Sequence, residues 1–311
     1  MKNLNSAIIK KILFLAALSF IFTLTSFAQG NPNLQKGQEF LANENLEGAN
    51  KEFSQCIATE KKAGVKSQCY LWRAEAQIDS KLRLKDINSA LRLAPNSDEI
   101  YVKRGQYYFG GEDYINSLPD FKKALKLNPK NAKAHFFLGQ INDEYGKPEA
   151  AIKSYSEAIR LKCEFKSTYL LRGEVYLQSL EDYDKAIADF NKYIELEPTV
   201  GDGYLARGNA YQRKGDKAKA KADYEMLLKL EVYANLGTEL LADLNLSKAE
   251  FLTKANEYFQ EGDNEATIAF LNSFPEFAED VKVIELKANA YQEMGKTKKA
   301  AFYFHKLKAV K

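Results

Sequence analysis

Residue types that commonly do chemistry are sparse in this 311-residue chain, and none of them forms a catalytic pattern. An enzyme needs a positioned nucleophile, an acid–base pair or a metal cluster. The two histidines, His135 and His305, lie far apart, and the sequence has no H-E-x-x-H, C-x-x-C, Walker or G-x-S-x-G motif. The three cysteines have no recurring histidine beside them, as a zinc site would need. We therefore predict that the chain is not an enzyme and holds no cofactor or metal.

The cysteines offer redox chemistry instead. Cys56 and Cys69 are the only near pair in the sequence. They would lie on neighbouring helices joined by a short loop, and this geometry permits a disulfide bond but does not establish one. Cys163 stands at a place where most of the repeats described below have proline, and we expect it to be a small buried residue.

Arginine recurs in a phrase, Tyr-x-x-Arg-Gly-x-x-Tyr, which begins at Tyr101, Tyr169 and Tyr204. Such a series could bind an anionic ligand, but aspartates recur together with the arginines. These combinations are Arg73 with Asp86, Arg104 with Asp120, Arg172 with Asp189, and Arg207 with Asp223. Where the arginine is replaced, by Leu138, the aspartate is replaced too, by Ser154. A ligand-binding series would have no reason to follow the aspartates, so we favour an ion pair within each segment.

These residues need helices to position them. Apolar residues recur at helical spacing between the landmarks, and no alternating strand pattern competes. A repeat of about 34 residues indicates small units that gain a core only by stacking. We expect each unit to be two antiparallel helices, with a glycine or alanine on the first helix and a large aromatic residue on the second. These aromatic residues are Phe53, Phe121, Tyr155, Phe190, Tyr224 and Phe304.

This pattern resembles the tetratricopeptide repeat family over nearly all of the chain after residue 28. The third unit carries the resemblance most fully. Its landmark residues are Tyr101, Gly105, Tyr108, Phe121, Ala124 and Pro129. The resemblance implies an all-α fold, namely a right-handed superhelical solenoid of about eight stacked antiparallel helix pairs.

The regularity of the repeat divides the chain after residue 28 into three parts. Residues 29–232 hold six units, and residues 248–311 hold two more. Between them the period fails, so we predict an irregular connector or hinge at residues 233–247. The second unit is also irregular, and its spacing predicts a tightened turn near Asp79–Leu82 and a loosened loop at Lys61–Lys66.

The first part, residues 1–28, differs in kind from the rest. Lysines precede an apolar run from Ile12 to Phe22, and the small residues Ser26 and Ala28 follow it. This order is typical of a secretory signal peptide cleaved after Ala28. The alternative is an uncleaved helix that anchors the protein to a membrane, since the run could be extended to about the minimum spanning length. We expect an exported protein, periplasmic or extracellular, that contacts a membrane only if this helix is uncleaved.

Charge argues against nucleic acid as a ligand. The whole chain has 45 basic and 42 acidic residues, and residues 1–28 contain three lysines and no acidic residue. The remainder therefore has no net charge. It lacks the attraction to phosphates that dominates nucleic-acid binding.

The resemblance also implies where a partner would bind. In the family, the first helices of the pairs line a concave groove, and some of their outward residues contact extended peptides or partner helices. The matching residues here are Glu75, Gln106, Phe109, Phe136, Gln140, Asp143, Leu170, Glu174, Leu205, Asn209 and Gln212. The carboxylate clamp of chaperone-tail-binding members is not present, because Val102 and Phe136 stand where it needs lysine.

We therefore predict a non-catalytic scaffold or adaptor that binds a protein or peptide in this groove. Two other functions stay open. One is a membrane-tethered adaptor on an uncleaved N-terminal helix, and the other is an accessory that positions a substrate for an enzyme complex. The sequence does not identify the partner, because groove residues specify a type of surface and not a ligand.

Overall fold

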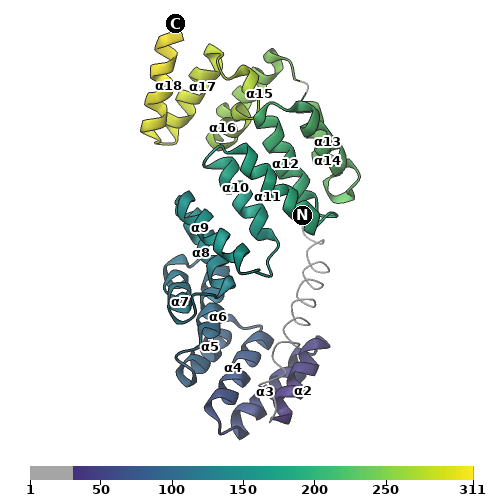
Figure 1. Cartoon of the computed structure of the whole chain (residues 1–311), viewed down its shortest axis with the longest axis vertical. Helices are drawn as coiled ribbons and strands as arrows, with labels where there is room; N and C mark the ends of the chain where they lie inside the picture. Colours follow the sequence, from purple (N-terminus) through teal and green to yellow (C-terminus); the bar gives the residue numbers. More distant parts are fainter. Residues whose placement is uncertain (1–30, 245, 311) are drawn as a thin grey trace. The chain divides into compact units, whose positions relative to one another are not determined.

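The computed structural model describes residues 31–244 and 246–310, and these residues form seventeen α-helices, two short 3₁₀ helices and no strand (Figure 1). The all-α fold expected from the sequence is confirmed. The predicted signal peptide lies outside the described residues. None of the described helices is both long and apolar enough to cross a membrane.

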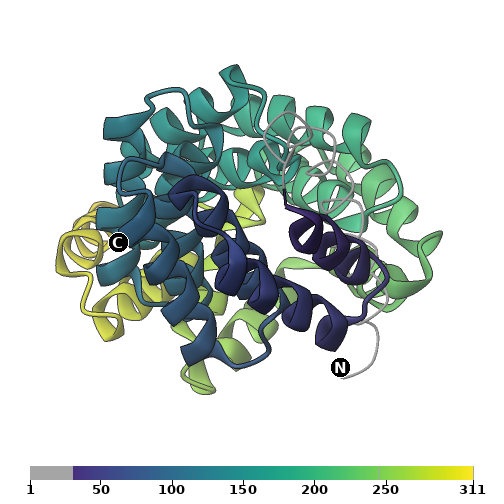
Figure 2. The same ribbon diagram turned by 90° about the horizontal axis from the view of Figure 1, so that it is seen from below.

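The chain divides into two compact units, residues up to Ile141 and residues from Asn142, so the division falls inside helix α8. The helices of the first unit follow one another as α2 (Pro32–Ala42), α3 (Leu46–Thr59), α4 (Ala63–Ala76), α5 (Ser80–Leu93), α6 (Asp98–Gly110), α7 (Tyr114–Leu127) and most of α8 (Ala132–Glu144). Helices α2 and α3, drawn in the darkest purple in Figure 2, form the first of its antiparallel pairs, and α4–α5 and α6–α7 form the next two.

The second unit continues the same order. Its helices are α9 (Pro148–Arg160), α10 (Ser167–Gln178), α11 (Tyr183–Leu196), α12 (Gly201–Lys214), α13 (Lys217–Leu228), α14 (Ala234–Asp243), α15 (Lys248–Gln260), α16 (Asn264–Asn272), α17 (Val281–Glu293) and α18 (Thr297–Val310), with the 3₁₀ helices η1 (Glu231–Tyr233) and η2 (Pro275–Phe277). The pairs are α10–α11, α12–α13, α15–α16 and α17–α18, and α14 has no partner helix of its own.

In four pairs, α2–α3, α6–α7, α10–α11 and α12–α13, an aromatic ring of the second helix packs against a glycine of the first. In α6–α7 the ring of Phe121 lies so close to Gly105 that an added Cβ would be 2.8 Å from it. Tyr224 approaches Gly208 in α12–α13 in the same way, at 2.5 Å. Both rings are completely buried. The missing side chain therefore lets the second helix lie against the first, and the ring fills the space between them.

The second pair departs from the sequence prediction at one end. The turn between α4 and α5 is tight, because α4 ends at Ala76 and Asp79 caps α5 by accepting from the backbone N–H of Leu82. The predicted loosened loop at Lys61–Lys66 is wrong, since α4 already begins at Ala63. The additional residues lengthen the start of a helix, which satisfies their backbone groups better than a loop would.

The segment at residues 233–247 is also more regular than predicted. Helix α14 occupies most of it and packs against α13. Gly237 permits this approach, because an added Cβ would lie 3.0 Å from the backbone oxygen of Tyr224. Helix α14 thus fills most of the segment for which we expected an irregular connector or hinge, and the division of the chain there stays a prediction.

Candidate functional site

The four predicted charge pairs each form within one helix pair. Nε and Nη2 of the arginine donate to the two carboxylate oxygens of the aspartate on the second helix. The Nη2–Oδ1 distances are 2.6 Å for Arg73–Asp86, 2.7 Å for Arg104–Asp120, 2.7 Å for Arg172–Asp189 and 2.6 Å for Arg207–Asp223. The aspartate side chains are only 4–8% exposed, so these are two-pronged, largely desolvated contacts.

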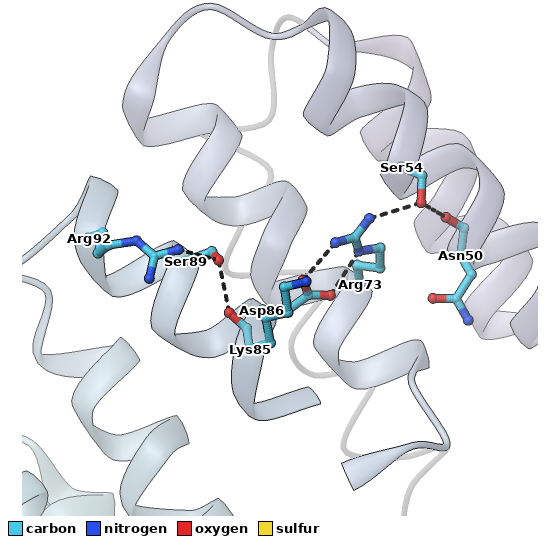
Figure 3. A network of polar contacts seen from close by, with 7 residues as sticks. All are labelled: Asn50, Ser54, Arg73, Lys85, Asp86, Ser89 and Arg92. Atoms are coloured by element: carbon cyan, nitrogen blue, oxygen red, sulfur yellow. Dashed lines mark hydrogen bonds and ion pairs between the residues drawn. The ribbon is translucent and has the colours of Figure 1, made fainter. Parts of the chain in front are cut away.

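A third hydrogen bond joins each arginine to the preceding helix pair. Nη1 of Arg73 donates to Ser54 of α3, and Figure 3 shows the guanidinium between Ser54 and Asp86 of α5. The other three bonds run from Arg104 to Asn88 (3.0 Å), from Arg172 to Ser156 (2.8 Å) and from Arg207 to Asn191 (2.6 Å). We name this unit of arginine, aspartate and preceding acceptor the arginine joint. It links three helices, namely the two helices of a pair and the helix that precedes them.

The preceding acceptors were missed by the sequence reasoning, although a signal for them exists. Each acceptor lies two residues after the place of the aspartate in its own helix. Lys122 occupies that place in α7, and the following helix, α8, has Leu138 instead of arginine. Acceptor and arginine thus vary together along the chain, as the aspartate and arginine do.

The electrostatics of the joints agree with a structural role. Hydrogen bonding to the aspartate raises the guanidinium pKa of Arg73, Arg104 and Arg207 above the ordinary value. Their donors are directed at protein acceptors on two helices, which leaves little of the guanidinium for a ligand. The ion-pair interpretation is therefore favoured over an arginine series that binds an anion.

A pocket of about 170 Å³ lies in the first unit between α4, α5 and α6. It is lined by Leu71, Ala74, Glu75, Arg83, Ile87, Lys103, Gln106 and Tyr107. Lys103 of α6 donates to Glu75 of α4 at 2.6 Å. The structure thus brings together Glu75 and Gln106 of the predicted groove. Sequence reasoning missed Arg83 and Lys103, which also line the pocket, because they lie outside the positions that the family resemblance supplies.

The other groove residues predicted for the first unit are more enclosed. The ring of Phe109 packs against Tyr114 and Phe137 at centroid distances of 5.4 and 5.3 Å. Phe136 is only 5% exposed. Oε1 of Gln140 is buried and has no hydrogen-bond partner in the described part of the chain. The rings of Phe109 and Phe136 therefore take part in the packing of the unit, although Phe109 is only half-buried, and their contact with a ligand stays a prediction.

Four predicted groove residues of the second unit also belong to its packing. Leu170 and Leu205 lie against clusters of buried residues. Gln212 is 5% exposed. Its Oε1 and the Oδ1 of Asn209 lie 2.7 and 2.8 Å from the hydroxyl of Tyr224, whose single proton they share as acceptors. The amides expected to bind a peptide backbone here satisfy a buried tyrosine instead.

Asp143 and Glu174 complete the predicted set, and both are half-buried. Burial raises the pKa of the Asp143 carboxyl, with a further contribution from Glu144. Burial also raises the pKa of the Glu174 carboxyl, and the charges of Asp143 and Asp202 add to this effect. The two carboxylates therefore repel one another at a partly desolvated place.

The histidines and the remaining acidic residues form no reactive centre in the part of the chain that the structure describes. A ring nitrogen of His135 lies 3.0 Å from the backbone oxygen of Pro129, a contact that stabilises a turn. No three histidine, cysteine or acidic side chains are placed to hold a metal ion within residues 31–244 and 246–310.

Comparison with known proteins agrees with this architecture. Residues 102–163 match the tetratricopeptide repeat family, and so do residues 167–200 and 201–231. These segments are tetratricopeptide repeats (TPRs). The matched TPR segments contain three of the four arginine joints almost entirely, because Arg104, Arg172 and Arg207 all lie within them.

Parts of the chain are similar to several known proteins and to solved structures. The chain is 32% identical over 93 residues to human tetratricopeptide repeat protein 13, and the match covers 30% of this chain and 11% of that protein. It is 25% identical over 164 residues to the human mitochondrial import receptor subunit TOM70, covering 51% of this chain and 26% of the relative. The chain thus spans only a small part of either relative. The solved structure of Pseudomonas aeruginosa PilF has a TM-score of 0.59 and 16% identity, covering 68% of this chain and 96% of PilF, and it shows the shared fold alone.

A disulfide joins Cys56 and Cys69 on the N-terminal side of the matched TPR segments. The bond connects α3 to α4, with 6.0 Å between the two Cα atoms, and both residues are completely buried. It links the same two helices as the hydrogen bond from Arg73 to Ser54. Cys163, expected to be buried, is half-buried.

Proposed function

We propose that this chain is a non-catalytic TPR scaffold that binds an extended segment of a partner protein at the pocket between α4, α5 and α6. The pocket itself is the observation that carries the proposal. Its lining combines the apolar side chains of Leu71 and Ile87 with charged and amide side chains. Such a mixture suits a peptide, which has both apolar side chains and a polar backbone.

The size of the pocket supports a peptide over a small-molecule substrate. Sites for drug-sized ligands have volumes of about 300–1,000 Å³. The pocket here has about 170 Å³, which is space for one side chain. The amide of Gln106 is placed to hydrogen-bond to the backbone of a peptide beside it. A partner would therefore bind by one anchoring side chain and by contacts along the helices that flank it.

We further propose that the scaffold is exported to the periplasm or the extracellular space. The support is the signal-like order of residues 1–28, together with the disulfide Cys56–Cys69, since disulfides persist in oxidising compartments. The membrane-tethered alternative predicts a different mature protein. Mass spectrometry of the purified native protein tests this: a chain beginning at Gln29 supports export with cleavage, and an intact N-terminus supports the tether.

Site-specific photo-crosslinking tests the binding site. A photo-reactive amino acid in place of Gln106 should capture a discrete partner in native extracts. The same amino acid in place of Lys122, which is exposed on α7, is the matched control and should capture none. Lys103→Glu should abolish the Gln106 product, because it places a carboxylate beside Glu75. Equal products at Gln106 and Lys122, or a product insensitive to Lys103→Glu, would contradict the proposal.

A further inference from the structure

The last helix pair contains a buried cation that lacks the partner found elsewhere. We name as the joint position the residue before the small residue of each first helix. It is occupied in order by Lys36, Arg73, Arg104, Leu138, Arg172, Arg207, Lys254 and Lys287. In α17–α18 the place of the aspartate is taken by Tyr303, and the preceding acceptor place by Leu271. Lys287 is 5% exposed and forms no ion pair with a described carboxylate.

Every other cation at the joint position has an ion-pair partner within the described residues. The four arginines have their aspartates. Lys36 pairs with Glu52 at 2.8 Å, and Lys254 pairs with Asp243 of α14 at 2.5 Å. Lys287 is therefore the exception among them. An ammonium group buried without a counter-ion destabilises a fold, so its presence calls for a compensating anion.

A second buried cation lies in the same region of the second unit. Arg213, in the last turn of α12, is 8% exposed, and its Nε has no hydrogen-bond partner in the described part of the chain. Its Nη1 donates to Gln178 at 2.9 Å, while its Nη2 is 3.9 Å from Glu181. The guanidinium thus has a neutral acceptor at Nη1, a distant carboxylate at Nη2 and no acceptor at Nε. Its charge acts on the ammonium group of Lys287.

The charged groups around Lys287 come from four places in the unit. Burial lowers the pKa of its ammonium group to about 8. Glu181, in the turn between α10 and α11, and Glu279, before α17, act against this shift, whereas Arg213 and Lys306 reinforce it. Glu279 is already paired with Lys306 of α18 at 2.7 Å. Glu181 is held more weakly, since it lies 3.9 Å from Nη2 of Arg213 and its side chain is 63% exposed.

Tyrosine rings form the rest of the surroundings. The Lys287 ammonium lies 5.8 Å from the ring centre of Tyr303, and the Arg213 guanidinium lies 5.7 Å from that of Tyr183. Tyr291 and Tyr303 stack on one another with a centroid distance of 5.6 Å. Aromatic faces attract cations, but they do not neutralise them. The region therefore keeps two positive charges and borders solvent at Glu181.

We propose that Arg213 and Lys287 form a binding site for a carboxylate of an acidic peptide or protein segment. The ligand carboxylate would take the place that Glu181 holds only loosely, accept from the unused Nε of Arg213 and compensate Lys287. Its class follows from the chemistry present: the anion nearest to the cluster is itself a carboxylate, and guanidinium and ammonium donors bind carboxylates strongly.

This site is separate from the features already described. Lys287 corresponds to Arg104, and not to Val102 or Gln106, where the clamp of the family would require its lysine and asparagine. The site also does not depend on the α4–α6 pocket, which lies in the first unit. A negative result for either site leaves the other intact.

Fluorescence anisotropy with a labelled pentaglutamate peptide tests the proposal, with pentaglutamine as the uncharged probe. The full chain should bind pentaglutamate, and Lys287→Met should weaken this binding by roughly tenfold or more, since charge-assisted hydrogen bonds are lost. Lys287→Arg should retain it. Glu181→Gln should strengthen it several-fold, because the competing carboxylate is removed; a lysine with a purely structural role would not respond to that substitution.

The matched control is Lys254→Met, which removes a lysine at the same position of the neighbouring pair, where Asp243 is its partner. It should leave the affinity for pentaglutamate unchanged. Lys287→Met exchanges a buried cation for an apolar side chain of similar length, so it should fold, and its thermal midpoint should equal or exceed that of the wild type. Pentaglutamate binding equally to wild type and Lys287→Met, equal losses in the two lysine variants, or an unchanged affinity in Glu181→Gln would overturn the proposal.

Discussion

Helix pairs α12–α13 and α17–α18 place a cation at the same position and surround it differently. Arg207 receives the carboxylate of Asp223 on its own pair and the side-chain oxygen of Asn191 on the preceding pair. Lys287 faces the ring of Tyr303, and the preceding place holds the buried Leu271. In the first arrangement the buried cation has acceptors on its own helix pair and on the preceding one. In the second the buried cation has no carboxylate partner.

The difference shows that the helix pair determines burial but not the balance of charge. The close packing of aromatic and small residues makes the joint position partly or wholly buried in either pair. A cation there contributes to stability only when neighbouring helices supply acceptors, because the desolvation of an ion otherwise exceeds what it gains. The same position can thus hold a structural contact in one pair and an open binding group in another.

The largest effect should come from breaking a complete joint. Asp189→Ala removes the carboxylate of Arg172 and leaves a guanidinium that is only 19% exposed without its counter-ion. Loss of one partner of a buried pair costs about 3–5 kcal/mol. We expect about 3 kcal/mol, since Ser156 continues to accept from the arginine. Chemical denaturation of the purified variant measures the change in the free energy of unfolding.

The control for this variant lies on the same helix. Asp184 pairs with Lys214, but its side chain is 80% exposed. Exposed ion pairs contribute about 0–1 kcal/mol, so Asp184→Ala should change stability little. Equal unfolding free energies for Asp189→Ala and Asp184→Ala would show that the arginine joint is not a structural element.

The absence of a carboxylate partner for Lys287 should instead affect the pH dependence of stability. The pKa of Lys287 is lowered from 10.5 to about 8. Between these values the unfolded chain binds more protons than the folded protein, so stability should rise with pH. From pH 7 to 9.5 the gain attributable to this lysine should be about 2 kcal/mol. Lys287→Met should be more stable than the wild type at pH 7 and should lack this gain.

Urea denaturation at a series of pH values measures this difference. Tyrosines limit the upper end of the range, because burial raises the pKa of Tyr291 to about 12, and stability falls as the unfolded chain loses its tyrosine protons above about pH 10. Lys254→Met again serves as the comparison. Parallel pH profiles for the wild type and Lys287→Met would mean that Lys287 titrates normally and that α17–α18 is not deficient in compensating charge.

Much of the joint could be predicted from the sequence, because its residues repeat. Arg104, Arg172 and Arg207 recur in one phrase, and the aspartates follow them at a nearly constant distance. A repeat places the same structural environment in the chain several times. Two positions whose residues change together from one repeat to the next are therefore expected to be in contact. The acceptors Asn88 and Asn191 emerge only from a comparison between consecutive helix pairs, because each lies on the helix before the pair of its arginine.

Helix α14 and the surroundings of the groove residues could not be predicted, because they do not recur from one repeat to the next. Helix α14 packs against α13 but belongs to none of the helix pairs, so no recurring landmark marks it. The groove residues were assigned by their places in the repeat, and a place does not reveal what surrounds a side chain. Asn209 accepts from the hydroxyl of the buried Tyr224, whereas Gln106, at the equivalent place of α6, lines a pocket. Burial of these amides depends on neighbours that differ between units.

The smallest change in stability should come from removing the preceding acceptor of an arginine joint while its ion pair stays intact. Asn191→Ala removes the acceptor that links Arg207 to the preceding pair, while Asp223 stays bound. Asn191 is exposed, so water replaces part of the lost hydrogen bond, and we expect a loss of about 0.5–1 kcal/mol. Lys122→Ala, at the equivalent place before Leu138, should change stability by less, because no arginine follows it. Denaturation of both variants in parallel checks this order, and a larger loss in Lys122→Ala would show that the contact between pairs contributes nothing beyond the pairing of Arg207 with Asp223.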